Sequence, residues 1–248
     1  TGTDLMVHSS LKSLGYVVNG ASEVIDAIID CIGINEGTLL MPTHTGQLTD
    51  PSFWKKPIFT ASEIHVIKEN MLTFDKEKTP VRGRGVLPST LLTYPLVERS
   101  NHPLNSVGAL GKKAKFYTKE HDFDSPEGIN SPIGKLYQSN GKVLGIGVGV
   151  NRFTSIHLAE YLMDLDYLYK DNPIVLYENK EGKNIFNRIK KYPGDSENFN
   201  KILPTLREKN LIYERKFKMG VLTCFSIKPV IDTVVELLKE NPDFLIKE

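Results

Sequence analysis

Residues 142–164, KVLGIGVGVNRFTSIHLAEYLMD, decide the fold and point to a site. The apolar start of this stretch predicts a buried central strand over Lys142 to Val150, and a helix over Thr154 to Asp164 follows it directly. In open α/β sheets, ligands bind at the carboxyl ends of the strands. The first turn of this helix is therefore where a functional site is expected.

The predicted helix carries its polar side chains on one face. At about 100° per residue, His157, Glu160, Tyr161 and Asp164 fall in one stripe, and apolar residues fill the opposite arc. An imidazole with a carboxylate three residues later can be held in one tautomer and act as a general base, and the helix dipole disfavours a charged imidazole in the first turn. An ordinary solvated helix face would show the same stripe. Both interpretations stay open at this point.

The rest of the chain continues the alternation of strands and helices. Asp4–Ser10 predicts a first strand, an amphipathic helix opens at Ser22 and ends at Gly33, and Thr38–Thr43 predicts a second buried strand. Strands separated by a helix favour parallel pairing, and two runs around Glu181 predict a hairpin. We therefore expect a single elaborated α/β domain over residues 1–248.

Further elements are predicted from shorter patterns. Segment 44–85 has three prolines and little periodicity, which is typical of a functional excursion that covers a site. The predicted short helices are Pro88–Tyr94, Gly111–Tyr117 and Pro132–Gln138, and the later ones are Phe199–Lys209 and Lys228–Asn241, with a strand over residues 221–227 between them.

Composition excludes several classes of protein. Lys and Arg total 31 against 30 Asp and Glu, and the net charge of +1 gives no field to recruit nucleic acid or an anionic membrane. The apolar runs are shorter than the ~20 residues that cross a bilayer. Cys31 and Cys224 are too far apart for a metal motif or a disulfide scaffold, and the polar start carries no signal peptide. We expect a soluble cytoplasmic monomer or homodimer without a metal.

Two loops carry groups suited to phosphate. The Ser-rich stretch His8–Gly15 follows the first strand and offers backbone N–H groups, hydroxyls and an ammonium to a phosphate. A Ser-rich turn that merely precedes a helix would have the same sequence. Arg82 and Arg84 flank Gly83 and suit bidentate pairing with phosphate, although a solvated basic turn fits equally. The glycines of residues 145–149 lack the spacing of a dinucleotide loop and indicate close approach of a backbone or ligand.

An acidic cluster offers a different kind of recognition. Glu120, Asp122, Asp124 and Glu127 lie within eight residues, in a spacing that does not match a calcium loop. The cluster could bind a polycationic substrate, and it could equally be an ordinary exposed acidic loop. Farther upstream, His102 precedes a proline-restricted turn, where a site role and a structural hydrogen bond both fit.

Taken in order, several segments carry a family resemblance. They are VHSSLKSLG, GTLLMPTHTG, DPSFW, FDKEKTPVRGRG, RSNHPLNSVGALGKKA, INSPIGKLYQSNGKVLGIGVG and TSIHLAEY, and they span residues 5 to about 168. This ordered set closely resembles the aminoglycoside 3-N-acetyltransferase family, also called the antibiotic N-acetyltransferase family. Members of that family carry a helix before the first strand, so we expect the start of this chain to be truncated.

The resemblance implies an α/β/α layered fold with a mixed central sheet, acetyl-coenzyme A as co-substrate donor, and an amine as acceptor. It implies that His157 is the general base and Glu160 its companion carboxylate. The loop residues that it assigns to the coenzyme pyrophosphate are Ser9, Ser10, Leu11, Ser13 and Gly15, with Arg82 and Gly83 added.

The acceptor is predicted from the acidic side chains. We expect a polycationic aminoglycoside, acetylated on its 3-amino group, to be recognised by Asp122, Asp124, Glu127 and Asp164. Two alternatives keep the same motifs. One is acetylation of a different primary amine, and the other is a coenzyme-A-binding protein without transferase activity.

Overall fold

A mixed sheet forms the centre of the protein. The computed structural model describes residues 2–179, 181–217 and 219–246. Within them, the strands of the main sheet, in spatial order, are β3 (Glu98–Arg99), β4 (Val107–Gly111), β2 (Thr38–Pro42), β1 (Asp4–Ser9), β5 (Lys142–Ile146), β9 (Gly220–Ser226) and β8 (Tyr213–Phe217). Strand β1 pairs in parallel with β2 and β5, and the other pairings are antiparallel.

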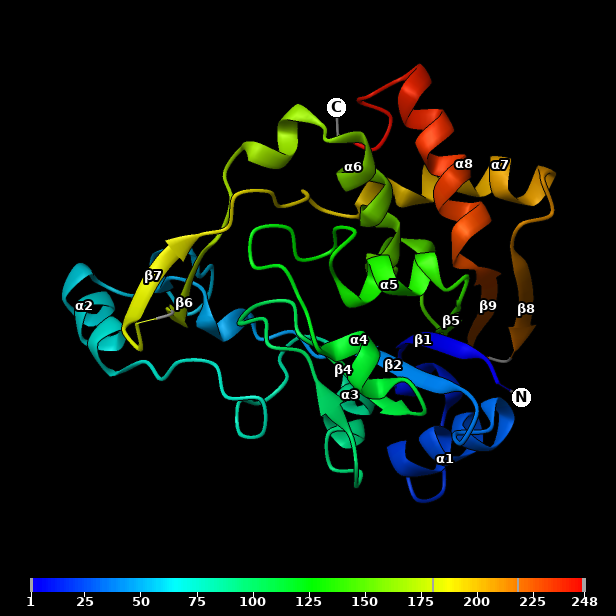
Figure 1. The fold of residues 1–248 in the computed structure, drawn as a ribbon, viewed down its shortest axis with the longest axis horizontal. Coiled ribbons are helices and arrows are strands. Elements are labelled where there is room, and N and C mark those ends of the chain that lie inside the picture. The colour runs from blue at the N-terminus through cyan, green and yellow to red at the C-terminus, as the bar shows by residue number, and fades with distance from the viewer. Residues whose placement is uncertain (1, 180, 218, 247–248) are drawn as a thin grey trace.

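Helices cover both faces of this sheet (Figure 1). The α-helices are α1 (Ala21–Ile32), α2 (Ala61–Asn70), α3 (Val86–Leu91), α4 (Ala114–Thr118), α5 (Pro132–Gln138), α6 (His157–Met163), α7 (Leu203–Glu208) and α8 (Ile227–Glu240). The 3₁₀ helices are η1 (Leu11–Leu14), η2 (Gly46–Leu48), η3 (Pro51–Phe53), η4 (Val150–Arg152), η5 (Thr154–Ile156), η6 (Asp166–Tyr169) and η7 (Glu197–Ile202). In the described ranges, each helix is too short or too polar to span a membrane.

Alternating side chains of the strands build two cores. In β1, Met6 packs into the core of α4, α5, α6 and α8, whereas Leu5 and Val7 pack into the core of α1 and α3. This alternation follows from the period of two in a strand, which sends neighbouring side chains to opposite faces. The predicted α/β/α fold with a mixed sheet in a single domain is confirmed. That the domain spans residues 1–248 stays a prediction.

Local sequence signals explain several boundaries. Helix α1 ends where predicted, at Gly33, whose left-handed backbone (φ 68°) lets its N–H reach the Ile29 carbonyl at 3.0 Å. Helix α5 has the predicted bounds, with Ser131 capping its first turn. Helices were also predicted at residues 199–209 and 228–241, where η7 with α7 and then α8 are found.

A small lobe lies at one end of the sheet, on the left of Figure 1. There the predicted hairpin forms as β6 (Ile174–Glu178) paired with β7 (Asn184–Arg188), and it packs beside α2. The Lys68 ammonium of α2 lies 4.6 Å from the ring centroid of Phe186 and 2.5 Å from Asp50. The middle of segment 44–85 is therefore folded against the hairpin, whereas His44 and Arg84 near its two ends line cavities.

Candidate functional site

The histidine and glutamate of α6 form a buried pair. His157 Nδ1 lies 2.5 Å from Glu160 Oε2, and the two side chains are 8% and 3% exposed. Tyr161 is buried beside them, while Leu162 is 40% exposed. The polar stripe of this helix therefore faces inward, and its interpretation as a solvated face is wrong for these residues. Asp164, which ends α6 with a left-handed backbone (φ 50°), is the exposed exception.

Neighbouring charges set the protonation of this pair. Burial lowers the pKa of the His157 imidazole, but the charge and hydrogen bond of Glu160, together with the charge of Glu127, outweigh burial and hold that pKa above its ordinary value. Because Glu160 accepts the hydrogen of Nδ1, Nε2 is the ring nitrogen left to take up a proton.

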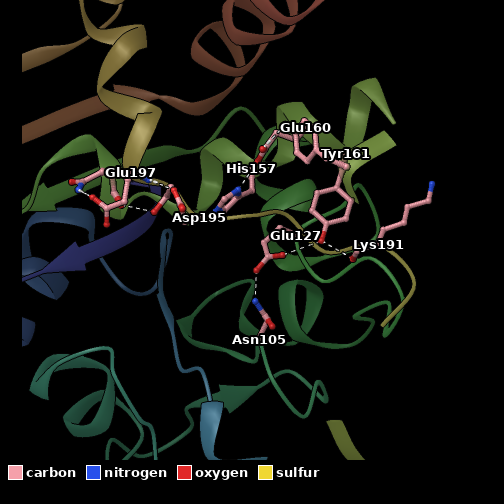
Figure 2. A network of polar contacts seen from close by, with 11 residues as sticks. Asn105, Glu127, His157, Glu160, Tyr161, Lys191, Asp195 and Glu197 are labelled. Atoms are coloured by element: carbon pink, nitrogen blue, oxygen red, sulfur yellow. Dashed lines mark hydrogen bonds and ion pairs between the residues drawn. The ribbon is translucent and has the colours of Figure 1, made fainter. Parts of the chain in front are cut away.

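His157 lines a polar cavity of about 250 Å³. Figure 2 shows Glu127, Asp195 and Glu197 around the imidazole, with Glu160 behind it. The other residues that line the cavity are His44, Arg84, Asn105, Asn151, Arg152, Thr154, Tyr192, Pro193, Gly194 and Ser196. The cavity therefore combines two imidazoles, three carboxyl groups and two guanidiniums.

Glu127 is held in this cavity by a rigid set of neighbours. It is 2% exposed; Asn105 Nδ2 donates to Oε1 and the Tyr161 hydroxyl lies 3.2 Å from Oε2. Burial raises the pKa of the Glu127 carboxyl, and the opposing charge of His157 reduces that rise.

His102 fixes the Asn105 end of this arrangement. Its Nδ1 accepts the backbone N–H groups of Leu104 (3.1 Å) and Asn105 (2.9 Å), so Nε2 carries the hydrogen that it donates to the Phe123 carbonyl at 3.2 Å. Burial lowers the pKa of His102 to about 4. Of the two roles considered for this histidine, the geometry matches the structural hydrogen bond.

A second cavity, of about 170 Å³, adjoins the first. Ser9 and Gly83 line it, while Arg84 and Arg152 line both cavities. Arg84 Nη2 lies 2.5 Å from His44 Nδ1, so this guanidinium stands at the junction. The second cavity lies at the carboxyl end of β1, where the α/β rule places a ligand.

Comparison with known proteins identifies the family. The pattern of the aminoglycoside 3-N-acetyltransferase family matches residues 6–239. The aminoglycoside N(3')-acetyltransferase-like protein YokD of Bacillus subtilis, derived from the SPbeta prophage, is 32% identical over 251 residues, which cover 100% of this chain and 90% of YokD. The chain belongs to the aminoglycoside 3-N-acetyltransferase family. The aminoglycoside N(3)-acetyltransferase III of Pseudomonas aeruginosa is 33% identical over 65% of this chain and 58% of that enzyme.

Solved structures of the family share the fold. The crystal structure of YokD superposes with a TM-score of 0.88 at 31% identity and covers 98% of this chain and 88% of YokD. AAC-IIIb, solved as a binary complex with CoASH, has a TM-score of 0.78 at 25% identity over 96% of this chain and 90% of its own. A mutant of AAC(3)-IVa in complex with apramycin has a TM-score of 0.80 at 25% identity over 98% and 87%.

The other loop residues that were predicted to contact the coenzyme are not among those that line the second cavity. The turn that contains Ser10, Leu11, Ser13 and Gly15 is closed on itself, because Ser10 O accepts from Ser13 N (3.0 Å) and Ser13 Oγ (2.6 Å). Gly147 makes room for this turn, since a Cβ there would lie 1.5 Å from Ser13 Oγ. The Ser13 side chain makes this close approach, and the backbone of Gly147 is also approached by Gly220, where a Cβ would lie 3.0 Å from Gly147 Cα.

Arginine placement differs from the expectation. The predicted Arg82 is exposed and contributes a backbone N–H to the His44 carbonyl at 2.9 Å, whereas Arg84 lines both cavities. The sequence shows both arginines but does not show which of the two faces the cavities. Which one turns inward depends on how the chain crosses the sheet edge.

The predicted acidic set is divided by the fold. Glu127 reaches the cavity, but Asp124 and Asp164 pair with Lys190 (2.6 Å) and Lys191 (2.7 Å), and Asp122 Oδ1 accepts the Asp124 N–H. The structure thus places three of the four predicted acids away from His157. Lysines pair with two of these acids, and a backbone N–H group binds the third. The sequence pattern does not show that the lysines come into contact with these acids.

Two other acids were missed. Asp195 lines the cavity from the loop before η7, and Glu197 lines it from the first position of η7, where its Oε1 lies 3.8 Å from Arg152 Nη2. Their only sequence signal is two acids in a short polar turn, which nothing local connects to His157. In the described part of the chain, the structure shows no group of three or more acidic, histidine or cysteine side chains placed to hold a metal ion. The absence of a metal stays a prediction.

Proposed function

We propose that the protein is an acetyl-coenzyme-A-dependent N-acetyltransferase that modifies the 3-amino group of an aminoglycoside, with His157 as general base. The single observation that carries this proposal is the buried His157–Glu160 pair on the wall of a cavity that adjoins a second, arginine-lined cavity through Arg84. The order of these parts fits a reaction in which acceptor and donor meet at the imidazole.

The donor is proposed to enter by the second cavity. Arg84, Arg152 and the Ser9 end of β1 supply positive charge and polar groups that fit the phosphates of coenzyme A. Gly83 leaves space beside them, since a Cβ there would meet nothing within 4 Å. The complex of AAC-IIIb with CoASH supports this choice of donor for a family member.

The acceptor is proposed to occupy the cavity of about 250 Å³ that His157 lines. Glu127, Asp195 and Glu197 can attract the ammonium groups of a polycationic sugar, and the complex of AAC(3)-IVa with apramycin supports an aminoglycoside there. Asp122, Asp124 and Asp164, which the sequence suggested for this task, are replaced in the proposal by Asp195 and Glu197.

The reaction needs a neutral amine, because an ammonium has no lone pair. After the ammonium loses its first proton to solvent, the nitrogen attacks the thioester carbonyl while His157 Nε2 takes the second proton. Glu160 stabilises the imidazolium that forms. A C–N bond replaces the C–S bond, and the proton on Nε2 passes to the departing thiolate. The products are the N-acetylated amine and coenzyme A.

An assay of thiol release tests this proposal. The protein is incubated with acetyl-coenzyme A and a panel of aminoglycosides and simple primary amines, and free thiol is measured with a chromogenic disulfide. We expect turnover with at least one aminoglycoside, and mass spectrometry of the product should show one added acetyl group. Turnover with simple amines alone would select a different acceptor class. No turnover, together with measurable coenzyme A binding, would select the binding protein.

A further inference from the structure

Glu160 makes two strong contacts, and the proposed mechanism uses only one of them. His157 Nδ1 donates to Oε2, and the Tyr167 hydroxyl donates to Oε1 at 2.6 Å. Glu160 is 2% exposed, so each oxygen depends on a protein partner rather than on bulk water. The carboxylate is therefore clamped between an imidazole and a phenol.

The turn after α6 brings Tyr167 back to Glu160. Asp164 ends the helix with a left-handed backbone, and η6 then carries Tyr167 along the side of α6. Burial and the charge of Glu160 raise the pKa of the Tyr167 phenol far above its ordinary value. The phenol thus keeps its hydrogen over the whole working pH range and always donates to the carboxylate.

We propose that Tyr167 is a positioning residue, which fixes Glu160 behind His157 and limits how tightly the pair holds a proton. This inference rests on the proposed function, because it assigns Tyr167 to the same base. It concerns a residue outside the TSIHLAEY motif, on a helix that the sequence patterns did not predict.

The direction of the effect follows from charge. A hydroxyl that donates to a carboxylate stabilises its negative charge. When the hydroxyl is removed, the deprotonated pair, with neutral His157 and charged Glu160, loses more stabilisation than the protonated pair does. The reason is that no positive charge on His157 compensates the carboxylate in the deprotonated pair. The pair then takes up its proton at a higher pH, whichever of the two groups holds it. Less neutral imidazole is left to act as base near pH 7.

Other charged groups lie around the pair and are unchanged by this substitution. On the side of the cavity that His157 lines, the charges of Glu127 and Arg84 act on His157, and Asp195 lines the cavity with it. The Tyr161 phenol lies within reach of the charge of Glu160. Behind the pair, a cavity of about 320 Å³ is lined by Glu160 and Tyr167 together with Lys170, Asp171, Tyr192 and Asp195. Asp243 adds a negative charge near Tyr167. Only the hydroxyl that contacts Oε1 is removed by Tyr167→Phe.

The chain offers a matched control on the same helix. Tyr169 donates its hydroxyl to Asp164 Oδ1 at 2.8 Å, which is the same kind of contact on the same 3₁₀ helix. That contact is exposed and lies away from both cavities. Tyr169→Phe therefore removes a phenol-to-carboxylate hydrogen bond without touching the His157–Glu160 pair.

The test is the pH dependence of kcat/KM for both variants, measured by thiol release. For Tyr167→Phe we expect an acid limb shifted upward by about half a unit, a loss of up to about threefold at pH 7, and recovery as the pH rises. For Tyr169→Phe we expect the wild-type profile. An equal loss at every pH, or an unchanged profile in Tyr167→Phe, would overturn the inference.

A second readout does not depend on turnover. The imidazole C–H signal of His157, assigned by its absence in His157→Gln, is titrated by NMR in wild type and in both variants. We expect an upward shift in Tyr167→Phe alone. If this shift occurs but the wild type transfers no acetyl group, the proposed function fails and the positioning role stands. If the wild type is active and the signal titrates unchanged, the positioning role fails alone.

Discussion

In the described residues, two helices carry a histidine–glutamate pair: the pair on α2 is exposed, and the pair on α6 is buried beside a cavity. On α2, His65 Nε2 lies 3.3 Å from Glu69, and these side chains are 73% and 61% exposed. On α6, His157 lies 2.5 Å from Glu160, and these side chains are 8% and 3% exposed. The two pairs have similar spacing in sequence, so spacing alone does not separate a surface contact from a candidate catalytic pair.

The environment makes the difference. Water and salt screen the exposed pair, whereas burial removes the competing solvent from His157 and strengthens the pull of Glu160 on its proton. The α6 pair also borders a cavity of about 250 Å³, which His157 lines, and the Tyr167 hydroxyl donates to the Glu160 carboxylate. Helix α2 buries no residue at all, so its pair has neither.

The largest contrast is expected from removing each imidazole. We expect His157→Ala to lower kcat by at least about 10²-fold, within the range usual for general-base catalysis, while the KM for acetyl-coenzyme A stays nearly constant. His65→Ala should keep wild-type turnover. Steady-state thiol release with an aminoglycoside measures both, and a fully active His157→Ala would remove this imidazole from the mechanism.

Removing each carboxylate should have the next largest effect. In Glu160→Gln the main cause that raises the pKa of His157 is lost, and burial then lowers that pKa. Since the base acts when neutral, the acid limb of kcat/KM should move to lower pH, while kcat on the plateau falls by about tenfold. Glu69→Gln should change neither quantity. A limb that stays in place in Glu160→Gln would contradict the electrostatic account of the pair.

A smaller effect should separate the acids of the cavity from those of the surface. We expect Asp195→Asn to raise the KM for the acceptor several-fold, about 1 kcal/mol, because it removes one attraction for an ammonium. Asp124→Asn, which breaks only a pair with an exposed Lys190, should leave that KM within about twofold. Kinetics at low and high salt provide the check, since the Asp195 effect should shrink as salt screens it.

The smallest effect concerns the stability contributed by the surface pair. We expect the double substitution of His65 and Glu69 to Ala to change the free energy of unfolding by less than about 0.5 kcal/mol. Urea unfolding followed by circular dichroism would measure it. A loss of several times that size would show that α2 supports the hairpin lobe through these side chains.

Long, regular patterns allowed most of the fold to be predicted. The apolar runs of β1, β2 and β5 and the amphipathic α1 and α8 stand out because their periodicity is sustained. Strand β8, with the sequence YERKF, was missed because a polar edge strand shows no apolar alternation. Helix α2 was missed because it has no buried apolar face and so shows no helical periodicity of apolar residues, although Thr60 and Glu63 form a capping box that marks its start.

The site shows the same division. His157 and Glu160 are close in sequence, so one helical turn fixes their contact whatever the rest of the chain does. Arg84, Asp195 and Tyr167 reach the site by turns and loop returns, whose paths depend on packing against distant segments. Asp124 and Asp164 show the reverse case, since lysines far along the chain pair with them.

What the sequence determined by itself was the α/β layering, the family and the contact between His157 and Glu160, because these depend on periodicity and on separations of a few residues. Only the tertiary structure decided which arginine and which acids face the cavity, and that a phenol stands behind Glu160. The physical reason is that burial and solvent exclusion arise from segments far apart in sequence, and these two conditions determine whether a charged pair is screened or reactive.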